Sequence, residues 1–335
     1  MIIKGLAVTV VTVALMSAPG HAAAEAGCTW EPTVLPVPPE LAEAGINAGD
    51  GDWFAGWGAE PGAGPFDDTP GVRWRGDVPE SLGLAFDQPT NVYGVSPNGV
   101  VAGAVLDASW QTSAVVHRGK EWTLLPKKGT SSWAYDVNAE GFAVGYDNTE
   151  DLDARIERLT VWPPNEFAVP RVLPAPAGRE LGIGHPRIDD DGTVVAPYSR
   201  FEAPSVIGEG YVWRPGAPAP TRLAPLSPDD SVSVTDLRGG HIVGTSNGIG
   251  VEWNLGGEIV RKFDGRAEAV NRDGFVLGTA TDGTPVVWAP DGAVERLTEP
   301  TGYSSWSARA FGDRTVGGQA SVGSTTVPVT WQRAC

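Results

Sequence analysis

The stretch AVNRDGFVLGTATDGTPVVW, residues 269–288, has the pattern of two short strand pairs folded around tight turns. Asn271 and Asp273 are residue types that hydrogen-bond their own backbone, and Gly274 supplies a positive φ, so NRDG predicts a turn. The flanking apolar residues predict two paired strands, and Gly278 allows a neighbouring backbone to come close. PVVW predicts a third strand, and VERLTEP predicts a polar, alternating outer edge strand.

This pattern recurs along the chain. Close counterparts of residues 270–278 lie at 95–103, 137–145, 188–196 and 310–318, and looser ones lie at 46–56 and 234–244. An apolar strand follows each copy and ends in an aromatic ring, at Trp74, His117, Trp162, Trp213, Trp253, Trp288 and Trp331. Successive rings are 35–51 residues apart. This period, with strand-type content, predicts an all-β fold, a seven-bladed β-propeller of four-stranded antiparallel blades, with the rings packed between blades.

The seventh unit ends at the C-terminus without a fourth strand. The segment CTWEPTVLPVP, residues 28–38, resembles the fourth strands of other units, so the mature N-terminal strand is predicted to pair into the last blade and close the ring. This pairing would bring Cys28 and Cys335 together as a disulfide, which could add roughly 5 kcal/mol by the chain-entropy model. In the alternative, Cys28 carries a lipid, although Glu25 stands where a lipoprotein signal has an apolar residue.

The first residues have the pattern of a secretory signal peptide. Lys4 precedes an apolar run from Leu6 to Met16, and small residues follow as cleavage sites. The run is too short to span a bilayer as a helix. Residues 1–26 are therefore predicted to be a removed signal peptide, and residues 27–335 a single propeller domain that is secreted and monomeric, with lipid anchoring through Cys28 as the minor alternative.

The net charge of −17 argues against nucleic acid as a partner. The sequence predicts no transmembrane segment, no metal site and no cofactor. The expected partner is an extracellular glycan, peptide or protein of unknown identity.

The repeats resemble the HAF-type repeats of exported bacterial proteins, which read A-x-x-[IV]-N-x-x-G-x-[IV]-x-G before an apolar-apolar-Trp strand. The copies AEAVNRDGFVLG…PVVW and AYDVNAEGFAVG…LTVW carry the resemblance, whereas those starting at Val234 and Ala310 depart from the motif. The resemblance covers residues 28–335 and implies a secreted repeat propeller. It implies no particular reaction, because propellers host many functions.

Blade geometry separates the connections onto two faces. First-to-second and third-to-fourth turns lie on one face, and here they are short and uniform; we name this the short-turn face. The other connections are long and varied, as at 57–71, 147–158 and 198–209, and we name their side the variable face. A ligand is expected there, because loops on a rigid scaffold carry function. The candidate binding residues are Trp57, Trp110, Trp133, Phe201, Tyr303 and Trp306.

Three functions remain open. The first is a non-catalytic binding module that recognises a glycan, peptide or surface partner through the variable face. The second is a propeller glycan hydrolase or lyase whose paired carboxylates meet at the central funnel, with Asp67, Asp147 and Asp151 as candidates. The third is a purely structural envelope protein, in which the varied segments are tolerated insertions and the aromatic rings only pack. The sequence favours the first and offers no confident catalytic residue.

Overall fold

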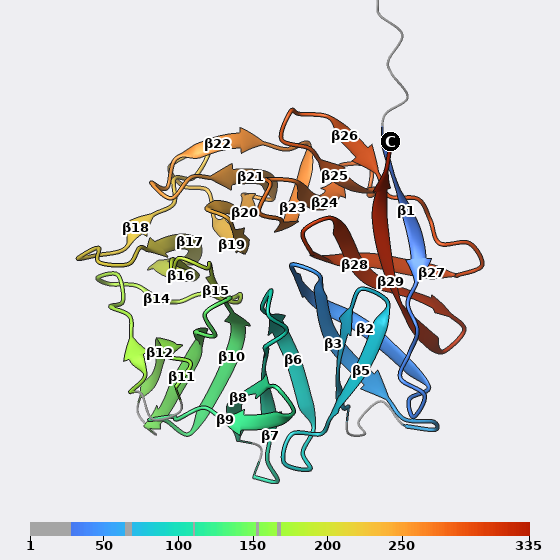
Figure 1. Cartoon of the computed structure of the whole chain (residues 1–335). Coiled ribbons are helices and arrows are strands. Elements are labelled where there is room, and N and C mark those ends of the chain that lie inside the picture. Colours follow the sequence, from blue (N-terminus) through green and yellow to red (C-terminus); the bar gives the residue numbers. More distant parts are fainter. Residues whose placement is uncertain (1–27, 64–68, 110, 152–153, 166–168) are drawn as a thin grey trace, which may run out of the picture.

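The computed structural model describes residues 28–63, 69–109, 111–151, 154–165 and 169–335. These residues form seven antiparallel sheets, arranged as the blades of a closed ring around a central axis (Figure 1). The predicted seven-bladed β-propeller is therefore confirmed. Within the described ranges, no helix is long and apolar enough to span a membrane.

The strands follow the ring in chain order, each blade running from the axis outward. Blade 1 contains β2 (Glu43–Asp50), β3 (Trp53–Ala59), β4 (Gly71–Arg75) and β5 (Val78–Gly83). Blade 2 contains β6 (Thr90–Val95), β7 (Val101–Leu106), β8 (Thr112–Arg118) and β9 (Glu121–Leu124). Blade 3 contains β10 (Ser131–Val137), β11 (Ala143–Asp151), β12 (Ala154–Trp162) and β13 (Arg171–Val172).

The remaining blades complete the ring. Blade 4 contains β14 (Glu180–Leu181), β15 (Arg187–Ile188), β16 (Val194–Glu202), β17 (Ser205–Trp213) and β18 (Thr221–Arg222). Blade 5 contains β19 (Val232–Arg238), β20 (His241–Ser246), β21 (Ile249–Trp253) and β22 (Ile259–Lys262). Blade 6 contains β23 (Gly265–Val270), β24 (Val276–Ala280), β25 (Pro285–Trp288) and β26 (Val294–Arg296). Blade 7 contains β27 (Ser305–Phe311), β28 (Thr315–Val322), β29 (Thr325–Ala334) and, as its outer strand, β1 (Thr29–Val34).

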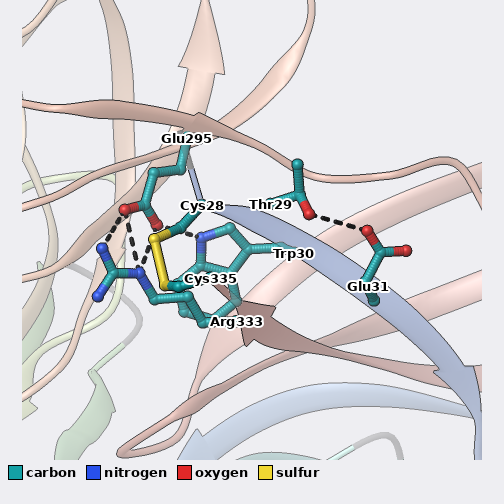
Figure 2. The surroundings of a disulfide bond; sticks show 7 residues. All are labelled: Cys28, Thr29, Trp30, Glu31, Glu295, Arg333 and Cys335. Atoms are coloured by element: carbon teal, nitrogen blue, oxygen red, sulfur yellow. Dashed lines mark hydrogen bonds and ion pairs between the residues drawn. A yellow bond between two sulfur atoms is a disulfide. The ribbon is translucent and has the colours of Figure 1, made fainter. Parts of the chain in front are cut away.

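The ring closes as predicted. β1 pairs antiparallel with β29, from Thr29 opposite Ala334 to Val34 opposite Val329. Cys28 and Cys335 form a disulfide with their Cα atoms 4.4 Å apart (Figure 2). We call β1, β29 and this disulfide the seam. The disulfide uses the Cys28 sulfur that lipidation would require, so the lipid alternative is not supported.

The aromatic rings that end the third strands pack between blades, as predicted. All seven rings are buried. The indole of Trp162 in blade 3 donates to the carbonyl of Pro126 at 2.7 Å, in the connection that leaves blade 2, and Trp253 donates in the same way to Ala224 at 2.7 Å. Blade 2 has His117 in this slot, and Trp122 on the neighbouring strand instead donates to Leu82 of blade 1 at 3.0 Å. In five of the seven slots the ring therefore combines apolar burial with a hydrogen bond to the preceding blade; these rings are Trp74, Trp162, Trp213, Trp253 and Trp331.

The NRDG-type turns also join neighbouring blades. Asn271 Oδ1 accepts the N–H groups of Asp273 and Phe275 at 3.1 and 2.9 Å, and Gly274 has a φ of 77°, so the predicted turn is confirmed. The Asn271 amide group donates to the carbonyl of Asp313 in blade 7 at 2.7 Å. The Asn of the motif thus closes its own turn and holds the next blade.

Two of the predicted long connections are strands. β11 and β12 pair residue by residue to Asp151 opposite Ala154, and β16 and β17 pair to Glu202 opposite Ser205. Residues 147–151 therefore pair with 154–158, and 198–202 with 205–209, so the prediction of varied loops there was wrong. At the end of the β16–β17 hairpin, residues 201–206 are exposed, so no apolar alternation marked these strands in the sequence.

Candidate functional site

Six of the seven inner strands carry a β-bulge at the same place in the repeat. The pairing register shifts by one residue in blades 1, 2, 3, 5, 6 and 7. The extra residues are Asn47, Tyr93, Tyr135, Thr235, Glu268 and Arg309. Because a bulge redirects a side chain out of the regular pleat, this device determines what the repeat presents at the axis.

A glycine in the second strand makes each bulge possible. A Cβ added at any of these glycines would lie 1.8–2.2 Å from a carbonyl oxygen of the inner strand, far inside van der Waals contact. They are Gly56, Gly103, Gly145, Gly244, Gly278 and Gly318. Blade 4 has Ala196 in this slot, and its inner strand has no such bulge but is divided into β14 and β15. The last Gly of the motif therefore specifies the bulge, which confirms the close approach predicted for Gly278.

The bulge residues surround a hollow on the axis of about 340 Å³, counted with the open solvent at its mouth. We call it the axial hollow. Asn47, Tyr93, Thr235, Glu268 and Arg309 line it, together with residues of the positions that follow them in the strands. The five bulge residues contribute an amide, a phenol, a hydroxyl and two opposite charges. Four more charged residues of the lining, Asp136, Arg187, Asp236 and Arg238, are ion-paired with one another. Such a set suits a small polar ligand that both donates and accepts hydrogen bonds.

One side of the axial hollow is aromatic. The ring of Tyr93 lies 4.9 Å from that of Tyr135, and Tyr135 stacks on His185 with 4.1 Å between centroids and 15° between planes. Burial raises the pKa of Tyr93. Burial of the imidazole away from water, and secondarily the charge of Arg187, lower the pKa of His185 to about 4. His185 is therefore neutral at neutral pH. Of these three rings only Tyr93 lines the hollow, where Arg187 also lies.

The opposite side carries charge. Glu268 of blade 6 is half-buried and accepts a hydrogen bond from Thr279 Oγ1 at 3.0 Å. Arg309 of blade 7 is exposed, and its Nε donates to Ser307 Oγ at 3.3 Å. Neither has an ion-pair partner within the part of the chain that the structure describes. An acceptor and a donor of opposite charge thus remain available on neighbouring blades.

At the short-turn face, two arginines cross the axis. Arg238 of blade 5 binds Asp136 of blade 3 at 2.9 and 3.1 Å, and its Nε lies 3.3 Å from Asp50 of blade 1. Arg272 of blade 6 binds Asp50, Asp190 of blade 4 at 2.7 Å and Asp313 of blade 7 at 3.1 Å. We call this group the ionic hub; it contains Asp50, Asp136, Asp190, Arg238, Arg272 and Asp313. Because it joins non-adjacent blades, it closes the channel at this end.

The hub leaves the axial hollow open toward the variable face. Each inner strand runs from the variable face to a short turn, and Thr235 precedes Arg238 in β19 just as Asn47 precedes Asp50 in β2. The bulge residues therefore lie on the variable side of the hub. A ligand in the hollow would meet the hub as its floor.

The axial aspartates are committed to structure. Asp136 accepts the backbone N–H groups of Val137 and of Ile188 in the next blade, both at 3.0 Å, in addition to Arg238. Asp236, at the same position in blade 5, accepts those of Leu237 at 2.9 Å and Val270 at 3.0 Å. These carboxylates align neighbouring blades and have little capacity left for a ligand.

The candidate binding residues are dispersed. Trp57, Trp133 and Tyr303 are half-buried; Trp57 lies over Gly45, and Trp133 and Tyr303 pack against the core. Phe201 is 71% exposed, near the end of the β16–β17 hairpin. Trp306 lines a hollow that adjoins the axial hollow. Trp110 lies outside the described residues.

The candidate carboxylates do not form a described pair. Asp147 is buried, and its oxygens accept the backbone N–H groups of Lys128 and Gly129, each at 2.9 Å. This side chain holds the connection between β9 and β10 and does not line the axial hollow. Asp67 lies outside the described residues, and Asp151 lies in β11 outside the residues whose side chains are described. Within the described side chains, no group of three or more His, Cys, Asp and Glu residues is arranged to hold a metal ion.

The sequence-based search missed the axial residues themselves. All six bulge residues directly follow the first apolar residue of the repeat, as Tyr135 follows Ala134 and Glu268 follows Ala267. The sequence signal is a polar or bulky residue directly after that apolar residue in each of the six copies. Strand alternation alone does not reveal a bulge, so the sequence pattern did not predict that these residues face the axis.

Comparisons with known proteins extend only to the fold. No protein-family model matches the sequence, and no curated protein matches it. The structure is similar to the β-propeller domain of the Trilobed protease from Pyrococcus furiosus, at 12% identity and a TM-score of 0.60, over 88% of this chain and 97% of that one. It is also similar to YCF48 bound to D1 peptide, at 14% identity and a TM-score of 0.54, over 91% and 97% of the two chains. A third neighbour is puromycin hydrolase, at 13% identity and a TM-score of 0.58, where the match covers 90% of this chain and 54% of that chain.

Proposed function

We propose that the protein is an exported, non-catalytic binding module of the HAF-repeat type. Its ligand, a glycan, a peptide or a surface partner, enters the axial hollow from the variable face. The observation that carries this proposal is the pair Glu268 and Arg309, two opposite charges without ion-pair partners among the described residues, placed above a hub in which the charges are mutually paired. Charges left unpaired at a concave site are the groups that a ligand can satisfy.

The neighbour that is bound to a peptide supports a binding role for this architecture, although the likeness itself extends only to the fold. Puromycin hydrolase is about twice as long as the region that matches this chain, so its activity is not transferred. A glycan hydrolase or lyase would need two converging carboxylates. Glu268 supplies one at the hollow, and Asp136 and Asp236 also line it. Both aspartates are already engaged by backbone N–H groups and lie beside Arg238, so neither is a free partner for Glu268.

Export rests on the pattern of residues 1–26 and agrees with a disulfide, which forms and persists in oxidising compartments. Fractionation of producing cells, with mass analysis of the product, tests it. We expect a mature chain that begins after Ala22, Ala24 or Ala26 and is found outside the cytoplasm. A cytoplasmic full-length chain would contradict export.

A combined glycan and peptide array, probed with the mature protein, tests the binding role. We expect a ligand whose binding is lost in Glu268→Gln and Arg309→Gln, because both remove a charge at the site. Arg266→Gln is the matched control, since Arg266 is exposed on β23 but does not line the hollow. An array without any hit, from a folded monomer, would favour the structural envelope protein instead.

A further inference from the structure

A second hollow extends outward between blades 6 and 7 from the axial hollow. Its volume is about 850 Å³ with the open solvent included, and we call it the radial groove. Glu268 and Arg309 line both the axial hollow and the radial groove, so the two compartments meet at this pair. The rest of the groove consists of Gly278, Thr279, Pro285, Trp306, Ser307 and Ala308. The combined site is therefore elongated, with an inner and an outer compartment.

Trp306 provides the aromatic surface of the outer compartment. Its ring is half-buried and packs on Trp331, with 5.3 Å between centroids and 39° between planes. Trp331 is itself fully buried, so this contact fixes the Trp306 ring from behind. The part of Trp306 that remains accessible lines the groove. Because the Trp306 ring is already fixed in place, it loses little conformational entropy when a flat apolar surface binds to it.

Hydrogen-bonding groups surround this ring. Thr279 and Ser307 orient Glu268 and Arg309 through the hydrogen bonds described above, which leaves one strong acceptor and one strong donor directed to the site. Apolar side chains contribute only Pro285, Ala308 and the indole. The radial groove thus contains one aromatic ring surrounded by polar side chains. Its described lining offers no deep apolar pocket for a large side chain.

We infer that the combined site binds a linear oligosaccharide, with one sugar ring between Glu268 and Arg309 and the next ring on Trp306. A pyranose has an apolar C–H face that fits an indole, and its hydroxyls both donate and accept, so they satisfy Glu268 and Arg309 together. A peptide would satisfy both groups only with particular side chains. This inference rests on the proposed function and specifies its ligand.

Titration calorimetry with cello-, xylo-, manno-, malto- and chito-oligosaccharides, from monosaccharide to hexasaccharide, tests the inference. We expect affinity for one series to rise on addition of the second sugar, and Trp306→Leu to reduce that gain by about tenfold while monosaccharide binding is unchanged. Glu268→Gln and Arg309→Gln should weaken the monosaccharide and the longer chains alike. Trp133→Leu is the matched control, because Trp133 has the same SSW context but does not line the groove.

The other outcomes are distinct. In one outcome, affinity does not depend on the number of sugars, or Trp306→Leu and Trp133→Leu reduce the gain from the second sugar equally. The outer compartment is then not a sugar subsite, and the inference is overturned although the binding function remains. If only peptides of the array bind, and Glu268→Gln abolishes that binding, the ligand class is wrong but the proposed function survives. If neither sugars nor peptides bind the folded protein, both are overturned.

Discussion

The indole Nε1 of Trp30 donates a hydrogen bond to the carboxylate of Glu295 at 2.8 Å, although 265 residues separate the two in the chain (Figure 2). Trp30 lies in β1 and Glu295 in β26, the outer strands of blades 7 and 6. Arg333 of β29 binds the same carboxylate. The closing strand is thus held by its own blade, by the disulfide and by the neighbouring blade.

We expect Glu295→Gln to lower the free energy of unfolding by about 2 kcal/mol, because the bond to Arg333 loses its charge while the amide oxygen can still accept from Trp30. Urea unfolding of the oxidised protein measures the effect. Glu299→Gln is the control, since Glu299 is exposed near the same blade edge. Equal losses in the two variants would show that Glu295 has no special role at the seam.

The disulfide should be intramolecular and should stabilise a seam that can still form without it. Intact mass of the unreduced chain should be two hydrogens below that of the reduced chain. The double variant Cys28→Ser/Cys335→Ser should remain folded through the β1–β29 pairing but lose up to roughly 5 kcal/mol, because the closed loop spans nearly the whole mature chain. Free thiols in the purified, unreduced protein, or a lipid mass on Cys28, would contradict this prediction.

Asp50 should give stability a measurable pH dependence. Burial, only partly offset by Arg238 and Arg272, raises the pKa of Asp50 to about 6 from an ordinary value of 3.8. The folded state therefore binds the proton more tightly, so the stabilisation from protonating Asp50 is complete below about pH 4 and is lost as the pH rises through 6. Relative to Asp50→Asn, the wild-type free energy of unfolding should fall by roughly 2 kcal/mol between pH 4 and 7.

Urea unfolding of both proteins across this pH range makes the comparison. Asp52→Asn is the matched control, because Asp52 is exposed in the same turn. A difference between wild type and Asp50→Asn that stays constant with pH would refute a raised pKa at Asp50.

The bulges should depend on their glycines. Gly244→Ala places a Cβ 2.0 Å from the carbonyl oxygen of Ser233, so the inner strand of blade 5 must shift. We expect a loss of about 1–3 kcal/mol, as for other overpacked sites, measured by thermal or urea unfolding. Ala196→Gly in blade 4 is the control at the same repeat position and should cost about 1 kcal/mol or less, the ordinary cost of Gly in a strand. A smaller loss for Gly244→Ala than for this control would mean that the bulge is not what requires the glycine.

Apart from the seam, which a missing fourth strand and two terminal cysteines indicated, the features that were predicted correctly depend on short-range geometry. Asn271 and Gly274 close a turn of a few residues, and Trp162 reaches only to the blade before its own. The interrupted inner strand of blade 4 was not predicted, although Ala196 in a Gly slot was its visible signal. The hairpin continuations of β11–β12 and β16–β17 were missed because no apolar alternation marked these strands in the sequence.

By itself the sequence determined the number of blades, the strands around each turn and the pairing that joins the two ends, because every repeat contains the residues that its own turn and its neighbour's packing require. Only the tertiary structure decided what meets at the axis. Arg272 and Asp50 are 222 residues apart and belong to blades 6 and 1, which are not neighbours in the ring. Ring closure brings such positions together, and the bulges, which break strand alternation, select the side chains that face the hollow.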